Sequence, residues 1–208
     1  AQRLNASKTQ YVLFTLQLNA FLDHPITVND QIITQSNDAK LLGVVLDRHL
    51  TFVTHVEESI KKSRGAVHGL LTLKRHGVNT SMLVKFYRTR VLSILTYAAA
   101  AWYTYTPQYA RDHLERHQSL CLRIIYPNID SYQQRMSQAG ILPINEVLHR
   151  ICTKYANKIV SSQQNNRLAI FVPPKQSSLG RHSERLADRR QFSARTALGS
   201  KSLFSVLS

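Results

Sequence analysis

The acidic side chains of this sequence are scattered, and their spacing argues against a divalent-metal site. Two-metal-ion chemistry on a phosphate needs carboxylates that converge on the ions. The seven aspartates are isolated from one another along the chain. The one adjacent pair of carboxylates, Glu57-Glu58, is followed four residues later by Lys61 and Lys62, which can pair with both. We therefore expect no catalytic carboxylate cluster and no bound metal or cofactor in this chain.

Other reactive side chains also lack the spacing of a catalytic motif. Cys121 and Cys152 lie in apolar helical patterns without a CxxC, and none of the nine histidines has a third ligand at a zinc spacing. We interpret the cysteines as buried free thiols of an intracellular protein, and His113 and His117 as residues on a helix surface. No glycine-rich phosphate loop or nucleophile–base arrangement occurs, so the chain alone should be catalytically inert.

Basic residues dominate the charge. The sequence holds 27 lysines and arginines against 12 acidic residues, a formal net charge of +15. The net charge is 0 in residues 1–52, +9 in residues 53–160 and +6 in residues 161–208. This balance favours a polyanionic partner, nucleic acid first, with an ordinary solvated basic surface as the alternative.

A membrane partner is not expected. No apolar run approaches the roughly 20 residues that span a bilayer, and no signal peptide precedes the first strand pattern. A basic helix lying on a membrane surface would fit the charge, but not the apolar character of the second helical pattern described below. We expect an intracellular protein, either nuclear or cytoplasmic.

The N-terminal residues have the composition of β-strands. Residues 10–16 are rich in β-formers, and residues 25–28 and 31–34 flank Asn29-Asp30, a pattern typical of a two-residue hairpin. Residues 40–46, KLLGVVL, are nearly all apolar, which predicts a single strand buried on both faces or in the seam between two layers.

From residue 53 the apolar period changes to that of a helix. The first helix is predicted from Val53 to about Lys74, with Gly77 as its stop. The second is predicted to be long and largely buried, from an N-cap among residues 79–81 to the alanines at 98–101.

Two further helical patterns follow, each opened by a proline. Pro107 begins one that ends at Pro127, and Pro143 begins another. We expect the last helix to bury a stripe formed by Val147, Ile151, Tyr155 and Ile159.

The expected fold class is therefore α+β, and mostly α overall. Short antiparallel strands occupy residues 1–52, a helical bundle occupies residues 53–160, and a basic, loosely ordered tail occupies residues 161–208.

Residues 40–56, KLLGVVLDRHLTFVTHV, form the most specific motif in the sequence. They match the pattern K-x-LGV-x-LD-x-x-L-x-F-x-x-H-[VI] at ten fixed positions, and the stretch LNASKT at residues 4–9 matches LN-x-x-K-T. In this order the motifs resemble the reverse transcriptases of non-LTR retrotransposons, the jockey-like elements especially. Weaker similarities follow in residues 87–102, 114–125 and 140–144, so the resemblance covers about residues 3–160.

The resemblance implies roles for the two motifs. Asn5, Lys8 and Thr9 would lie at the edge of the palm, near the incoming nucleotide, where a lysine can neutralise developing phosphate charge. Leu42-Gly43-Val44 would act as a primer grip, where a glycine lets the backbone approach the primer strand closely.

The resemblance also implies that the helices form a thumb, which holds the backbone of a template–primer duplex. Lys74, Arg75, Lys85 and Arg88 are the strongest candidates for phosphate contacts, because no acidic residue lies near them in sequence. The full candidate set is Lys61, Lys62, Arg64, Lys74, Arg75, Lys85, Arg88 and Arg90.

We expect a fragment of an RNA-directed DNA polymerase that binds the backbone of an RNA–DNA or DNA duplex. In the family, the aspartates that hold the required Mg²⁺ precede the LN-x-x-K-T block, so the remainder of the polymerase would be missing upstream of Ala1. Two alternatives stay open. One is a non-catalytic, basic helical module that recruits a protein, and the other is a degenerate, truncated retroelement product.

Overall fold

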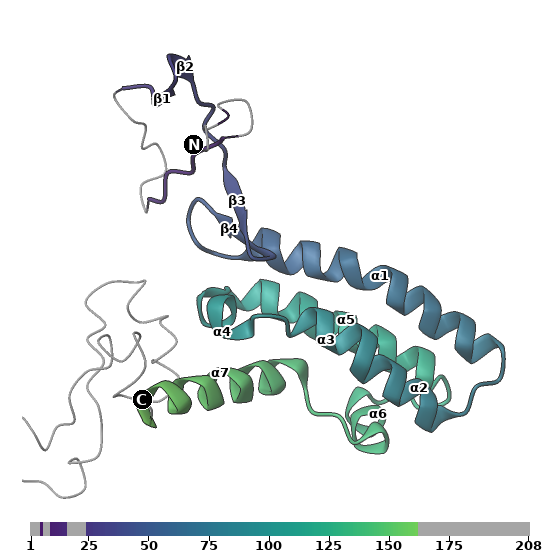
Figure 1. Ribbon diagram of the computed structural model, residues 1–208. Coiled ribbons are helices and arrows are strands. Elements are labelled where there is room, and N and C mark those ends of the chain that lie inside the picture. The colour runs from purple at the N-terminus through teal and green to yellow at the C-terminus, as the bar shows by residue number, and fades with distance from the viewer. Residues whose placement is uncertain (1–4, 6–8, 16–23, 162–208) are drawn as a thin grey trace, which may run out of the picture.

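Short strands pack at one end of a long helix and form a head, while the other helices form an elongated body beneath that helix (Figure 1). The computed structural model describes residue 5, residues 9–15 and residues 24–161. The tail predicted for residues 161–208 lies outside the described residues, except for Ser161. The predicted fold class, α+β and mostly helical, is confirmed by two small antiparallel sheets followed by helices.

The first hairpin forms where the sequence predicts it. Strands β1 (Thr27–Val28) and β2 (Gln31–Ile32) pair antiparallel around Asn29 and Asp30. Both turn residues have positive φ, 51° and 61°, as a tight two-residue turn between twisted strands requires. Asparagine and aspartate tolerate this left-handed conformation better than other side chains, which explains why the pair predicts a turn at this place.

The strand predicted for residues 10–16 is not formed in its described part. Tyr11 makes one isolated parallel bridge with Gln35, and further along the segment the N–H of Thr15 donates to the carbonyl of Arg48. Because these hydrogen bonds go to two different segments, the residues build no continuous ladder.

The single buried strand predicted for residues 40–46 is also wrong, because the chain reverses in its middle. Strands β3 (Asp38–Leu41) and β4 (Val44–Asp47) pair antiparallel around a turn at Leu42-Gly43. Leu42 has φ 47° and Gly43 φ 85°, and the Leu42 side chain is 84% exposed. Only β4 contributes side chains to the core, through Val44 and Val45.

Asp47 fixes the corner between β4 and the first long helix. One oxygen of its carboxylate accepts the backbone N–H groups of His49 and Thr51, at 3.2 and 3.0 Å, and the other oxygen accepts that of Phe52. Phe52 is itself in the left-handed region, with φ 57°, and its buried ring packs at 5.9 Å from the ring of Tyr105. The carboxylate therefore stabilises a strained corner that ends in a core residue.

His55 holds the same corner from within the helix that follows, α1 (Val53–Arg75). Its Nδ1 accepts the backbone N–H of Val45 at 3.3 Å, and its ring meets that of Trp102 edge-on at 5.2 Å. Burial lowers the pKa of the His55 imidazole to about 4, and the nearby Lys62 contributes to the shift. A neutral histidine thus ties α1 to both the hairpin and the body.

Helix α1 ends where it was predicted to, and its C-terminal region includes Gly77 with φ 73°. The next helix, α2 (Thr80–Phe86), begins at the expected N-cap, where the side chain of Asn79 accepts the N–H of Met82 at 2.9 Å.

The second predicted helix is not uniform. It widens into the π-helical turn η2 (Tyr87–Leu92), continues through α3 (Ser93–Leu95) and stops before Ala98, whose φ is 51°. The π turn directs both Tyr87 and Val91 into the core. Two short elements follow, α4 (Ala99–Trp102) and the 3₁₀ turn η3 (Tyr103–Tyr105).

The remaining helices are α5 (Gln108–Ile125), α6 (Tyr132–Ala139) and α7 (Ile144–Ser161). Helix α1 packs on α5 and η2, whereas α7 packs on α4 and α5, so α1 and α7 lie on opposite sides of the body (Figure 1). One hydrophobic core joins these helices, and its largest fully buried side chains include Trp102, Tyr87, Leu70, Leu83, Leu95, Leu114, Leu122, Ile125, Ile144 and Leu148.

The stripe predicted for α7 is wrong at Ile151 and Tyr155, whereas the predicted burial of Ile159 is confirmed. The helix buries Ile144, Leu148, Cys152, Ala156 and Ile159. Ile151 and Tyr155 stay partly exposed beside it. Cys152 and Ala156 are buried because α4 packs closely against this part of α7 and leaves room only for small side chains. The Cys152 sulfur lies 3.6 Å from the carbonyl oxygen of Ala99.

We expect the Asp47→Ala variant to lose about 2 kcal/mol of unfolding free energy, because three backbone N–H groups at the corner lose a charged acceptor. Chemical denaturation at neutral pH measures this loss. Asp112→Ala is the matched control, since the Asp112 carboxylate accepts from the exposed side chain of Gln108 and from no backbone N–H of the described residues, and it should stay within about 0.5 kcal/mol of wild type. Equal losses in the two variants would contradict the role given to Asp47.

The lowered pKa of His55 predicts a pH-dependent stability. The unfolded chain binds a proton at His55 near pH 6.5, whereas the folded chain does so only near pH 4. Stability is therefore fully present above pH 6.5 and falls as the pH drops from 6.5 towards 4, by about 3 kcal/mol. Burial also lowers the pKa of His117, which adds a contribution of the same sign.

Denaturation curves recorded between pH 4 and 8 measure this dependence. His55→Gln should remove most of the loss of stability below pH 6.5, whereas His113→Gln, which replaces an exposed histidine, should not change this loss. A His55→Gln profile as steep as that of wild type would show that another group controls the transition.

Candidate nucleic-acid interface

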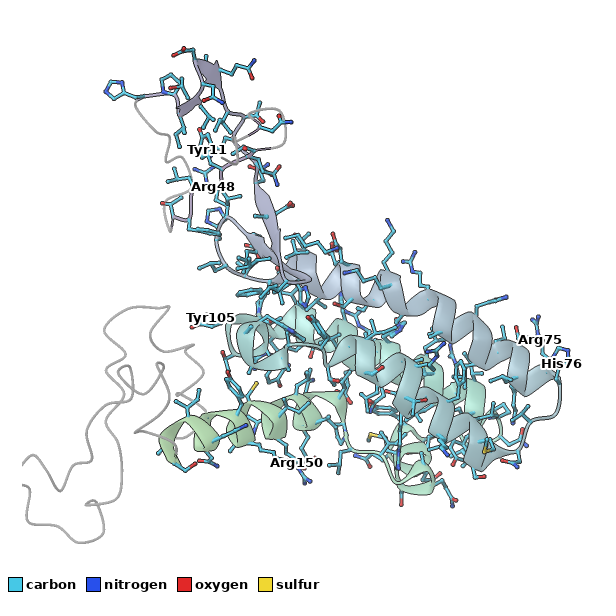
Figure 2. The ribbon with its side chains drawn as sticks, in the orientation of Figure 1. Tyr11, Arg48, Arg75, His76, Tyr105 and Arg150 are labelled. Carbon is cyan, nitrogen blue, oxygen red and sulfur yellow. The ribbon has the colours of Figure 1, made fainter. Side chains whose placement is uncertain are left out.

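Two basic side chains near the middle of α1, a histidine and an arginine at its end line the outer face of the helix. Lys61, Arg64, His68 and Arg75 follow one another at steps of three, four and seven residues, which places them on one side of a helix. All four are exposed, and they lie opposite the buried face that includes Leu70. Figure 2 shows Arg75 at the end of α1 farthest from the head. We call these four residues the α1 stripe.

Gly65 lies beside the α1 stripe and has no packing reason to be glycine. No heavy atom lies within 4 Å of the position where a Cβ would stand, and its φ is not positive. Glycine inside a helix is less favourable than alanine by about 1 kcal/mol. Because Gly65 has no side chain, the surface of α1 between Lys61 and His68 is shallow, and another backbone can approach the helix closely there.

Lys62 lies beside the α1 stripe and is partly neutralised. Its amine is 3.4 Å from the carboxylate of Glu58, which also lies 3.9 Å from the amine of Lys40 on β3. The expected pairing of Glu58 with Lys62 is thus confirmed. The equivalent pairing of Glu57 with Lys61 is not found among the ion pairs of the described residues, so Lys61 keeps its charge available.

Two of the strongest predicted phosphate contacts hold the body together instead. The amine of Lys74 donates to the carbonyl of Ile125, at 3.0 Å, and the guanidinium of Arg88 donates to the carbonyls of Ala139 and Gly140, at 3.0 and 2.7 Å. These carbonyls end α5 and α6, where a cation is favourable. Their partners are about fifty residues away in sequence, so a search for nearby acidic residues misses them.

The other predicted cations have free surface around them. Arg75, Lys85 and Arg90 are all exposed, and none of them makes an ion pair with another described residue. Their part in binding phosphate stays a prediction.

The hairpin tip is fixed to the body. The hydroxyl of Tyr97 donates to the carbonyl of Leu42 at 2.9 Å, and a Cβ on Gly43 would lie 3.3 Å from the Tyr97 ring. The three residues expected to act as a primer grip thus differ: Leu42 is exposed, Gly43 forms the turn and Val44 joins the core. Their proposed contact with a primer stays a prediction.

The N-terminal candidates are described only in part. The hydroxyl of Thr9 donates to the carbonyl of Asn5 at 2.8 Å, whereas Lys8 lies outside the described residues. A location near a bound nucleotide therefore stays a prediction for all three.

No metal-ion site is found within the described residues, since no three His, Cys, Asp or Glu side chains gather there. In that same part of the chain, no helix combines the length and the apolar character needed to cross a membrane.

Three residues of this region were not among the predicted site residues: Gly65, Tyr97 and His55. Tyr97 and His55 do lie within stretches that carry the family resemblance, which was the available signal for them. Their partners, Leu42 and Val45, become apparent only in three dimensions. Gly65 stands in an ordinary helical pattern, and the sequence contains no signal for its exposure.

Comparisons with known proteins agree with the resemblance drawn from the motifs. The chain is 32% identical over 101 residues to the probable RNA-directed DNA polymerase from transposon X-element of Drosophila melanogaster. It is 34% identical over 99 residues to the RNA-directed DNA polymerase from mobile element jockey of Drosophila funebris. These alignments cover 48% and 46% of this chain.

The same alignments cover 11% and 10% of the two relatives, so the chain matches about a tenth of their length. No family model matches the chain, and no solved structure does. The resemblance to the RNA-directed DNA polymerases of jockey-like, non-LTR retrotransposons is thereby confirmed over about half of this chain.

The contrast between Arg88 and its neighbour Arg90 gives a test of the assignments above. Arg88→Met should lower the unfolding free energy by about 1 kcal/mol, because two helix-ending carbonyls lose a charged donor. Arg90→Met, which removes the same charge from an exposed position, should change it by less than about 0.5 kcal/mol. Thermal unfolding of the two variants measures the difference, and equal effects would contradict the structural role of Arg88.

Proposed function

We propose that this chain is the thumb-bearing part of a reverse transcriptase and holds a template–primer duplex by its phosphate backbone. The observation that carries the proposal is the α1 stripe, where cations at helical spacing stand exposed on one face of a long helix. The similarity to two RNA-directed DNA polymerases supports a nucleic acid as the partner.

The length of the α1 stripe suits a duplex. From Lys61 to Arg75 the helix rises by about 21 Å, at 1.5 Å per residue. Along a duplex this distance corresponds to about six base pairs, each with a phosphate on both strands. Cations that follow such a path neutralise successive phosphates without touching base edges, so binding should depend on salt and little on base sequence.

The hairpin tip at Leu42-Gly43 lies at the head end of α1, and we propose that it contacts the primer strand. The fixed geometry supports this, because Tyr97 holds the turn in place before any ligand arrives. Lys40 and Lys62 flank the same end and add positive charge, offset in part by Glu58.

Catalysis in this proposal belongs to a different part of the polymerase. The Mg²⁺ ions of the reaction need converging carboxylates, and the described residues provide no such group. This chain would position the duplex, while residues outside it would hold the ions and the reacting phosphates.

The salt dependence of duplex binding tests the proposal. Each neutralised phosphate contributes about 0.9 to the slope of log affinity against log salt concentration, so the wild-type slope should be about −3 or steeper. Lys61→Gln, Arg64→Gln and Arg75→Gln should each reduce it by about 1.

Arg150→Gln is the matched control, because Arg150 lies on α7, on the other side of the body from α1 (Figure 2), where it pairs with Glu146 and should leave the slope unchanged. The measurement uses fluorescence anisotropy with labelled duplexes of two unrelated sequences. A wild-type slope near zero, or a strong preference for one sequence, would remove the proposal.

One observation favours a second function, that of a protein-recruiting module. The exposed Ile151 and Tyr155 of α7 face the alanines at 98–101 across a groove of about 540 Å³. An excess of heparin separates the two functions, since it should displace a duplex from the α1 stripe and leave a protein bound in an apolar groove.

A further inference from the structure

A pocket of about 290 Å³ lies between the hairpin tip and the helices. The turn supplies Gly43, α1 supplies Ser59 and Lys62, and the end of α3 supplies Ile94, with Tyr97 beyond it. This volume is at the lower end of the range for small-ligand sites, about 300 Å³, and suits a single nucleotide unit better than a larger ligand.

The ring of Tyr97 forms one wall of the pocket and is held rigidly although it is 53% exposed. Its hydroxyl is tied to the Leu42 carbonyl at 2.9 Å, and the absence of a side chain at Gly43 makes room for the ring edge. An exposed aromatic ring whose hydroxyl is already hydrogen-bonded offers a preformed surface for stacking.

The other groups around the pocket suit one nucleoside with its phosphate. Lys62 carries a charge at the rim that Glu58 offsets in part, Ser59 contributes a hydroxyl, and Ile94 adds an apolar surface. His55, which also lines the pocket, is neutral at physiological pH because burial lowers its pKa to about 4. The pocket thus combines a flat aromatic wall with one cation, which fits a nucleoside in a strand better than a free anion or an apolar peptide.

The pocket lies on the flank of α1, next to its outer face. Lys62, at the pocket rim, follows Lys61 in α1 but points about 100° further round the helix axis, so a strand that leaves the α1 stripe towards the hairpin tip would reach the pocket. We infer that the pocket binds one nucleoside of the bound strand, stacked on the ring of Tyr97. This inference rests on the proposed duplex binding and adds a contact that does not depend on charge.

Binding of a primer–template duplex by variants of the full chain tests the inference. Tyr97→Ala should weaken binding by about 5- to 150-fold, the range for loss of one base–aromatic stack, and should leave the salt slope unchanged because no charge is lost. Tyr97→Leu, which keeps most of the volume, should show the same loss. Tyr97→Phe, which keeps the ring, should lose threefold or less.

Tyr109→Ala is the matched control, because Tyr109 is 57% exposed on α5 and lines neither pocket nor stripe. It should bind as wild type does. Thermal unfolding shows whether each variant is folded before binding is measured. If Tyr97→Ala does not fold, the comparison of Tyr97→Leu with Tyr97→Phe tests the inference.

A spectroscopic readout locates the stack. A single 2-aminopurine is placed at successive positions of the primer strand. Wild type and Tyr97→Phe should quench its fluorescence at one position, and Tyr97→Leu should not. If wild type binds with a steep salt slope while Tyr97→Leu binds and quenches as wild type does, the inference is overturned and the proposed function stands. If wild type shows no salt-dependent binding, the proposed function fails first.

Discussion

The corner between β4 and α1 is the constraint on which the structure depends. The Asp47 carboxylate holds three backbone N–H groups of a strained loop, and His55 returns from the first turns of α1 to accept the N–H of Val45. Together they set the angle at which the long helix leaves the hairpin. If this corner were loose, the position of the hairpin tip relative to the cations of α1 would depend on the Tyr97 hydrogen bond and the Lys40–Glu58 ion pair.

The same corner gives a physical meaning to the motif that carries the family resemblance. Within residues 40–56, the glycine makes the turn, Asp47 caps the loop, Phe52 enters the core and His55 ties helix to strand. The shared residues therefore specify a joint between a hairpin and a helix. The phosphate contacts proposed for this chain come from side chains outside the motif, on the solvent face of α1, where helical spacing alone aligns them.

Local patterns predicted the elements whose ends are marked by special residues, such as the turn at Asn29-Asp30 and the helix that follows Pro107. The local patterns failed for residues 40–46, because an apolar segment can form either one strand or a hairpin. Hydropathy does not distinguish the two when an apolar residue such as Leu42 lies at the turn. The local patterns also misplaced the buried face of α7, since hydropathy favours large residues over Cys152 and Ala156, which close packing selects. The cationic residues could be identified from the sequence by their charge. The carbonyl groups that bind Lys74 and Arg88 come close to them only in the folded chain, so the sequence did not indicate these contacts.

Cross-linking from Gly65 can detect whether the outer face of α1 faces a bound duplex. A Gly65→Cys thiol would stand on open surface, whereas the native cysteines are buried. We expect efficient, salt-sensitive cross-links from Gly65→Cys to a duplex carrying thiol-reactive phosphates, and few from Lys154→Cys on α7, across the body (Figure 1). Equal yields from the two positions would show that the duplex does not bind along the outer face of α1.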